Sequence, residues 1–307
     1  ECLRELTEEH DRKDLRDELA WALNSRGLTY LTLHRRQRAL ADLDRSVDLF
    51  DRLVNQERQT QFRNGLAAAY NRRSEIHFAL HEYDQALKDS TQAVQLFTDL
   101  VEDMGREDLQ PLLAYAHRNQ SSVWAAKHNL DEANRSMEAA IKLFVKLSQG
   151  PDENRYAKDQ AACHLQLAQQ RQRARQHQES LSESGKAVAM LSQLSERDAS
   201  LDVRAILERA HFARGLSYLA TDQADKAQRD FTKSITLSTQ LVDEWRLDHR
   251  DELAEAFSQR GKTQLSAKQP KEGLRDFSKA IELRQKLVQE GRTDQSLALA
   301  QEFMERA

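Results

Sequence analysis

Glycine and proline are the scarcest structural signals in this chain. It contains 9 glycines and 3 prolines in 307 residues, about 4% together, where average usage is roughly 12%. β-Sandwiches, barrels and doubly wound sheets need Gly or Pro in turns roughly every 8–12 residues, and this chain has too few for such folds. The composition therefore predicts an all-α protein, and the length favours a repeat architecture whose core grows along one dimension.

Cysteine is also scarce, long apolar runs are absent, and neither sign of charge is in large excess. Cys2 and Cys163 are the only cysteines, too few for a disulfide framework or a thiolate zinc cluster. No apolar run approaches the roughly 18 residues of a membrane span. The net charge of −4 gives no general attraction to nucleic acid or to an anionic membrane. We therefore expect a cytoplasmic protein that binds neither nucleic acid nor membrane.

What the sequence does contain is an internal repeat with a period of 47 residues. The segment 67–97 aligns with 20–50 and with 114–144 at shifts of 47, and further steps of 47, 47 and 46 continue the pattern. Such self-similarity is typical of repeat proteins built from stacked helical units. The six predicted repeats are approximately 14–60, 61–107, 108–154, 155–201, 202–247 and 248–293.

Three columns of small residues support this register. Each column takes one residue from every repeat, and all 18 positions are Gly, Ala or Ser. Small side chains in register indicate points where two helices cross closely, because a large residue would hold the axes apart. The columns are Gly27, Ser74, Ser121, Ala168, Gly215 and Gly261; Ala39, Ala86, Ala133, Ser180, Ala227 and Gly273; and Ser46, Ala93, Ala140, Ala187, Ser234 and Ala280.

Each repeat is predicted to form two helices. Apolar residues between the columns recur at i, i+3, i+4 and i+7, which is typical of amphipathic helices. A helix A and a helix B are joined by a turn near 34–36, 81–83, 128–130, 175–177, 222–223 and 268–270. The same register places partial helices at 1–12 and 294–307. We expect these ends to be either the cut ends of a longer protein or caps of the array.

The columns resemble the tetratricopeptide repeat (TPR), whose pattern combines W-x2-L-G-x2-Y with Ala, an aromatic and Ala. Tyr70, Ser74, Tyr83, Ala86 and Ala93 match it in the second repeat, and the resemblance covers nearly the whole chain. The longer period and the missing proline at the end of helix B make this a long-helix variant. The resemblance implies one right-handed α-α superhelix over all 307 residues, a TPR-like solenoid of six helix-turn-helix repeats plus partial repeats at both ends.

In the TPR family helix A lines a concave groove, so the resemblance implies that a protein or peptide partner docks there. Asn can pair with a peptide backbone and Arg with its carboxylates. The candidate partner-binding residues are Trp21, Asn24, Asn71, Arg72, Phe78, Tyr115, Arg118, Asn119, Arg209 and Phe212. Around the last two the groove is expected to be more apolar. For any one residue the alternative is structural: an asparagine that caps or is solvated, or an aromatic such as Phe78 that packs between adjacent A helices.

The patterns of catalytic and metal sites are weak by comparison. His77 and His81 have the i, i+4 spacing of a chelating pair, but no third ligand is evident beyond Glu82 or Asp84. Cys163 stands in a column of alanines and is interpreted as a buried small residue. The sequence contains neither a glycine-rich phosphate loop nor GxSxG. We expect no enzymatic activity, no cofactor and no metal.

The sequence thus predicts a non-catalytic protein–protein interaction scaffold that binds a peptide or protein segment in its concave groove. The alternative is the sensor or regulatory arm of a larger multidomain signalling or defence enzyme, such as a kinase, protease or nuclease, with covalently linked domains outside this fragment. Both ends fall in mid-pattern, which favours that alternative. The 32 arginines against 14 lysines fit either carboxylate recognition or genome composition.

Overall fold

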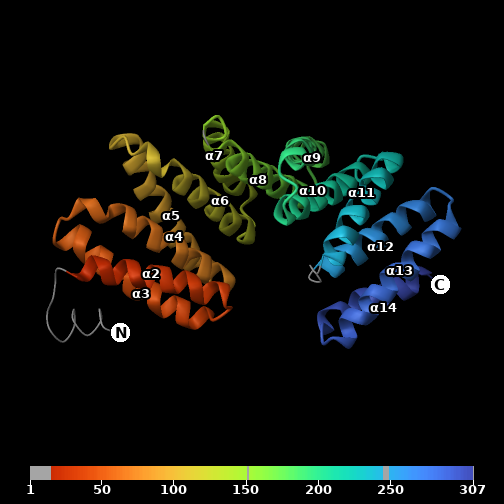
Figure 1. The fold of residues 1–307 in the computed structure, drawn as a ribbon, viewed down its shortest axis with the longest axis horizontal. Helices are drawn as coiled ribbons and strands as arrows, with labels where there is room; N and C mark the ends of the chain where they lie inside the picture. Colours follow the sequence, from red (N-terminus) through yellow and green to blue (C-terminus); the bar gives the residue numbers. More distant parts are fainter. Residues whose placement is uncertain (1–14, 151, 245–248, 307) are drawn as a thin grey trace. The chain divides into compact units, whose positions relative to one another are not determined.

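A computed structural model describes residues 15–150, 152–244 and 249–306 of the protein (Figure 1). This part of the chain contains thirteen α-helices, α2 to α14, and no strand, so the predicted all-α fold is confirmed. The predicted partial helix at 1–12 lies outside the described residues. Among the described helices, none is both long and apolar enough to cross a membrane.

A and B helices alternate along the chain, as predicted. The A helices are α2 (Arg16–Thr32), α4 (Arg63–Ala79), α6 (Gln110–Ala126), α8 (Glu153–Arg173), α10 (Leu201–Leu219) and α12 (Arg250–Ser266). The B helices are α3 (Arg36–Asp51), α5 (Tyr83–Thr98), α7 (Leu130–Leu147), α9 (His177–Arg197), α11 (Ala224–Asp243) and α13 (Pro270–Gln289). Helix α14 (Ser296–Arg306) follows as the helix A of a seventh repeat.

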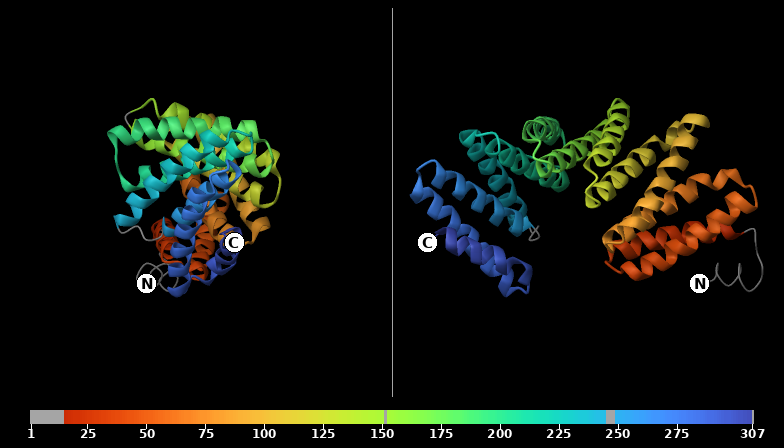
Figure 2. Two further views of the ribbon diagram at one scale, coloured as in Figure 1. Left: turned by 90° about the vertical axis from the view of Figure 1, so that its right-hand side faces the viewer. Right: turned by 180° about the vertical axis from the view of Figure 1, so that it is seen from behind.

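The chain divides into two compact units, Glu1–Gly150 and Pro151–Ala307, called unit 1 and unit 2 below. The division falls between the third and fourth repeats. Within each unit the two helices of a repeat run antiparallel, as both views in Figure 2 show. The B helix of one repeat packs on the A helix of the next, α3 on α4 in unit 1 and α11 on α12 in unit 2.

Helices A and B of each repeat cross at the first two small-residue columns. In the second repeat the Ser74 hydroxyl donates to the Ala86 carbonyl oxygen at 2.8 Å, directly across the crossing. In the sixth repeat a Cβ atom on Gly273 would lie 3.0 Å from the carbonyl oxygen of Gly261. All six residues of the third column have 0% of their surface exposed. The columns therefore mark close helix contacts, as steric exclusion predicts.

Every A–B turn contains one residue in the left-handed conformation. Its φ lies between 55° and 63° at His34, His81, His128, Arg175, Asp222 and Lys268. This residue ends helix A, and the next backbone N–H returns to the last turn, as from Glu82 to the His77 carbonyl oxygen at 2.8 Å. Because none of the six is glycine, each turn carries a Cβ in a conformation that costs about 1–2 kcal/mol.

Helix B continues past the position where the closing proline of the TPR pattern would end it. In the first two repeats it continues as the π-helical turns Arg52–Gln56 and Asp99–Asp103. In the other four repeats the α-helix itself is longer. The extension buries apolar side chains such as Leu53, Leu100 and Leu241. The prediction that helix B runs on without its proline is confirmed.

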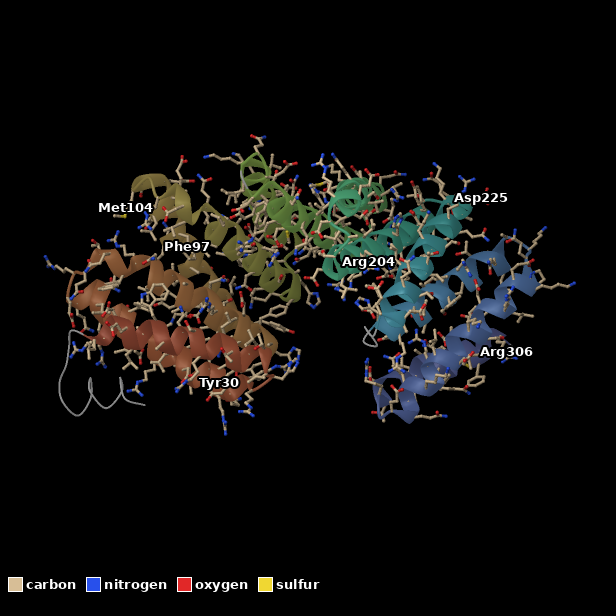
Figure 3. All side chains as sticks on the ribbon, viewed as in Figure 1. Tyr30, Phe97, Met104, Arg204, Asp225 and Arg306 are labelled. Atoms are coloured by element: carbon tan, nitrogen blue, oxygen red, sulfur yellow. The ribbon has the colours of Figure 1, made fainter. Side chains whose placement is uncertain are left out.

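Phenylalanines of the B helices are the largest side chains of the core. Phe50, Phe97 and Phe144 recur at the repeat period, and at most 1% of the surface of each is exposed. Phe97, labelled in Figure 3, belongs to a cluster with Ala67 of α4 and Leu113 of α6. One B-helix ring therefore joins the A helices of two successive repeats.

A second link between helices A and B, not predicted from the sequence, is an arginine–aspartate pair whose carboxylate is buried. Four repeats contain it at a spacing of 16 residues, with both hydrogen bonds of the guanidinium fork at 2.6–2.8 Å. The four aspartates are at most 8% exposed. The pairs are Arg26–Asp42, Arg73–Asp89, Arg214–Asp230 and Arg260–Asp276. They give several of the abundant arginines a structural role.

Candidate partner-binding site

In unit 1 the predicted residues lie on three consecutive A helices and are joined by hydrogen bonds. Arg72 Nη1 donates to the backbone oxygen of Asn24 at 3.1 Å. Asn119 Nδ2 donates to the backbone oxygen and to Oδ1 of Asn71, at 3.2 and 3.1 Å. Asn71 Nδ2 in turn donates to Glu75 Oε1 at 3.2 Å. We call these five residues the unit 1 row.

Glu75 is the acidic member of the unit 1 row. Desolvation raises the pKa of its carboxyl, while the charges of Arg72 and Arg118 and the hydrogen bond from Asn71 oppose that rise. Desolvation likewise lowers the pKa of Arg72, and Glu75 opposes it. Two guanidiniums thus surround one carboxylate, and the local charge is positive. Such a surface suits carbonyl or carboxylate groups of a partner.

The predicted aromatic residues of α2 and α6 lean on phenylalanines of the B helices. Trp21 contacts Phe50 edge to face, with ring centroids 5.1 Å apart, and Tyr115 contacts Phe144 in the same way at 5.3 Å. The Arg118 guanidinium lies over the Tyr115 ring, 5.0 Å from its centroid. Trp21 still exposes 37% of its surface. These rings therefore serve both the A–B interface and the A-helix surface.

Two predicted residues have surroundings that differ from the structural alternatives given for them. The Asn24 side chain is fully buried, and neither its nitrogen nor its oxygen has a hydrogen-bond partner. Only its backbone oxygen takes part in the unit 1 row. Phe78 packs on Tyr83 of its own repeat, with ring centroids 5.7 Å apart. A partner that binds the A-helix surface would therefore meet Arg72 and Asn119 rather than the Asn24 side chain.

Unit 2 contains a cavity of about 350 Å³ whose lining comes from α10 and α12. Arg209 and Phe212, both predicted, line it. The ring of Phe212 packs on Phe231, with centroids 5.7 Å apart. The region is less apolar than the sequence predicted, because α12 adds three carboxylates to it. The described lining residues, called the acidic pocket below, are Glu208, Arg209, Phe212, Asp251, Glu252 and Glu255.

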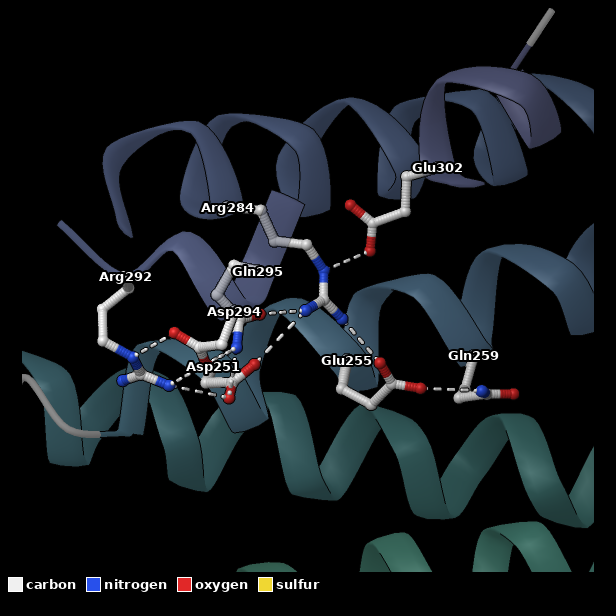
Figure 4. A network of polar contacts seen from close by, with 8 residues as sticks. All are labelled: Asp251, Glu255, Gln259, Arg284, Arg292, Asp294, Gln295 and Glu302. Carbon is white, nitrogen blue, oxygen red and sulfur yellow. Dashed lines mark hydrogen bonds and ion pairs between the residues drawn. The ribbon is translucent and has the colours of Figure 1, made fainter. Parts of the chain in front are cut away.

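Arg284 of α13 holds two carboxylates of the acidic pocket (Figure 4). Its side chain is 4% exposed and donates to Asp251 at 3.3 Å and to Glu255 at 2.6 Å. Its Nε donates to Glu302 of α14 at 2.7 Å. Gln295 adds a hydrogen bond to Asp251 at 3.0 Å. Arg284 stands where the TPR pattern has its closing proline, so the long helix B positions this part of the pocket.

Glu208 is the unusual residue of the acidic pocket. It is 1% exposed, its Oε1 accepts from the Ser234 hydroxyl at 2.5 Å, and its Oε2 has no hydrogen-bond partner. Desolvation raises the pKa of Glu208 to about 7, although the hydroxyls of Ser234 and Ser238 oppose the rise; Glu252 adds to it, and Arg209 lowers it. Glu208 already stands out in the sequence, because the equivalent position is alanine in the five other repeats: Ala20, Ala67, Ala114, Ala161 and Ala254.

The histidines considered as a chelating pair contact neighbouring side chains, and the cysteine is buried. His77 Nδ1 lies 2.6 Å from Glu82 Oε2, and His81 Nδ1 lies 2.8 Å from the Tyr83 hydroxyl. Cys163 is fully buried. Across the described residues, no group of three or more His, Cys, Asp or Glu side chains could hold a metal ion.

Comparison with known proteins identifies the fold. No family model matches the chain, and no curated protein matches it. The structure of BtubC (BKLC) from P. vanneervenii superposes with a TM-score of 0.63 at 16% identity, covering 82% of this chain and 92% of that one. Two structures of a Podosopora anserina putative kinesin light chain with nearly identical TPR-like repeats give TM-scores of 0.51 and 0.53, at 16% and 15% identity. They cover 73% and 75% of this chain, and 97% and 98% of their own. The fold is TPR-like, which confirms the resemblance drawn from the sequence.

Proposed function

We propose that this chain is a non-catalytic protein-interaction scaffold that binds a peptide or protein segment along its A helices. The observation that carries the proposal is the unit 1 row. Arg72 and Asn119 each reach from one A helix to the preceding one, so the Asn24 backbone oxygen of α2 and side-chain amide and guanidinium groups of α4 and α6 form a polar strip across three A helices. The hydrogen bond to Asn24 uses one of the five N–H donors of Arg72, which leaves donors for a partner's carbonyl or carboxylate oxygens.

An extended peptide suits this strip better than a compact ligand does. Its backbone presents carbonyl and N–H groups at regular intervals, and Asn side chains can pair with both. Arg118 over the Tyr115 ring adds a cation beside an aromatic surface. The proposal places the chain in the cytoplasm, in keeping with only two cysteines in 307 residues.

Changing Asn71, Arg72 and Arg118 together to Ala tests the proposal. Peptide ligands are first selected from a random displayed library on the wild-type chain, and their affinities are then measured by fluorescence anisotropy. Loss of one amide and two cations should weaken binding by about a hundredfold, at roughly 1 kcal/mol for each hydrogen-bonding group. Circular dichroism checks that the triple variant is folded.

A matched control changes the same kinds of side chain on the B helices. Lys88, Gln92 and Lys142 are exposed on α5 and α7, and replacing them by Ala should leave the affinity within about twofold. If the folded variant with Asn71, Arg72 and Arg118 changed to Ala binds the peptides as tightly as wild type does, the proposal is refuted. An equal loss in both triple variants would count against it too, because the effect would then not belong to the A-helix surface.

A further inference from the structure

We propose that the acidic pocket of unit 2 binds a cationic side chain, arginine or lysine, of the partner. The inference rests on the proposed function and adds the chemical class of the group that is recognised. All the lining residues that the structure describes belong to unit 2, on helices α10 and α12. The pocket is therefore separate from the unit 1 row and can be tested independently of it.

The charge balance of the pocket is the first argument. Four of its lining residues are carboxylates and one, Arg209, is a cation. Arg209 contacts Glu252 at 3.3 Å, and Arg284 holds Asp251 and Glu255. Two guanidiniums thus face four carboxylates. A bound cation relieves the repulsion among these carboxylates, whereas an anion would add to it.

The wider network does not remove this excess of negative charge. Figure 4 shows Arg292 beside Asp251, at 3.5 Å, and beside Asp294, at 2.8 Å. Arg284 also contacts Glu302 at 2.7 Å. The network therefore adds one cation and two further carboxylates to the groups of the pocket. The region keeps its attraction for a cationic ligand.

Glu208 supplies the second, independent argument. It lines the pocket with 1% of its surface exposed, and its Oε2 has no hydrogen-bond partner. A buried carboxylate oxygen without a donor is unfavourable, and five other repeats avoid it with alanine at this position. A guanidinium or ammonium group in the pocket would supply the missing donor. A cationic ligand thereby gives a reason for the departure from alanine, in addition to the Ser234 and Ser238 hydroxyls that act on this carboxyl.

The shape and lining of the pocket favour an organic cation. Phe212 provides an aromatic ring, on which a guanidinium or ammonium group is attracted to the face. A volume of about 350 Å³ lies near the lower end of ligand pockets, which run from roughly 300 to 1,000 Å³, and accommodates one long side chain. In the described part of the chain, no three acidic, histidine or cysteine side chains are arranged to hold a metal ion, which argues against a divalent cation.

The experiment uses the full chain and the selected peptides described above. Each arginine of a peptide is replaced in turn by citrulline, which keeps the shape and removes the charge, and each lysine by norleucine. One such replacement should weaken binding by at least about tenfold, as expected for loss of a charged hydrogen bond. Glu252→Gln and Glu208→Gln should each weaken binding of the parent peptide. In each variant, replacement by citrulline or norleucine should also reduce the affinity by less than it does with the wild-type chain. Glu272→Gln, exposed on α13, is the matched control.

Measuring the peptide affinity at several pH values adds a result that a merely structural role of Glu208 would not affect. The groups acting on Glu208 are Arg209 on its own helix, Glu252 on α12, and the Ser234 and Ser238 hydroxyls of α11. The pKa of Glu208 is raised to about 7, so its ionised form falls about tenfold from pH 8 to pH 6. Affinity for an arginine peptide, charged throughout, should fall by about the same factor. The Glu208→Gln variant should lose this dependence.

The outcomes separate the two proposals. Two results would refute the pocket and leave the proposed function standing, if the peptides still need the unit 1 row. One is equal binding after replacement by citrulline or norleucine, and the other is equal binding to Glu208→Gln and Glu252→Gln. Failure of the chain to bind any peptide refutes both. If Glu208→Gln does not fold, Glu208→Ala takes its place, because alanine occupies this position in five other repeats.

Discussion

Replacing Glu208 by Gln should stabilise α10 and α11 at pH 8 and lose that advantage in acid. Burial raises the pKa of the Glu208 carboxyl from its ordinary 4.5 to about 7 in the folded chain. A raised pKa means that the folded state binds the proton more tightly than the unfolded state does. The contribution of Glu208 to stability is therefore fully present below pH 4.5 and is lost as the pH rises through 7.

The magnitude follows from the two pKa values. At 1.36 kcal/mol per unit, the gap between 4.5 and about 7 corresponds to about 3 kcal/mol. Glu208 is 1% exposed, so solvent screens this effect little. Gln keeps the shape of the side chain and its ability to accept from Ser234, but it has no charge to bury. If the Gln side chain changes the free energy of unfolding by an amount that does not depend on pH, that amount cancels when the difference between variant and wild type at pH 4 is subtracted from the difference at pH 8.

Amide hydrogen exchange measures this local effect. The helices of a solenoid open in local units, so peptides from α10 and α11 report the free energy of their own opening. The ratio of protection in Glu208→Gln to that in wild type should be about a hundredfold larger at pH 8 than at pH 4. The exposed Glu272→Gln variant should give the same ratio at both pH values. Equal ratios for Glu208→Gln at pH 4 and pH 8 would refute the reasoning.

Three substitutions test the helix crossings and the buried ion pair. A Cβ atom on Gly215 would lie 2.7 Å from a ring carbon of Phe231, whereas one on Gly185 of α9 meets nothing within 4 Å. Gly215→Ala should therefore destabilise by about 1–2 kcal/mol and Gly185→Ala should stabilise by up to about 1 kcal/mol, seen as opposite shifts of the urea midpoint. Arg73→Ala leaves the carboxylate of Asp89, 2% exposed, without its bidentate partner. It should cost about 3 kcal/mol, and a loss below about 1 kcal/mol in thermal unfolding would contradict that role.

The helix pairs and their crossings could be predicted because steric exclusion acts on single positions. A residue such as Gly27 must be small wherever two helices approach closely, and the repeat period shows the requirement six times over. The A–B turns were predicted from the end of the helical pattern, without glycine at the left-handed position. The left-handed position holds His34, His81 and His128 in the first three repeats and Asp222 in the fifth, and His and Asp adopt this conformation more readily than most residues.

The polar chemistry depends on which side chains meet, and here the sequence informs less. Arg26 and Asp42 recur at the repeat period in four of the six repeats, but the pattern alone does not show that the two side chains meet. The period places Asn24 on helix A, while its complete burial depends on how closely the helices pack. The acidic pocket requires Arg284 to reach carboxylates 29 and 33 residues away in the chain. Only the folded structure brings these groups together.

The contacts that join helices A and B have a further consequence, for the order in which the chain folds. They connect residues 12 apart at the crossings and 16 apart in the arginine–aspartate pairs. Such short loops close at small entropic cost and are typical of fast-folding chains. A helix pair can thus form before the next pair has left the ribosome. Lengthening the array adds more loops of the same size, so the last repeat closes as readily as the first.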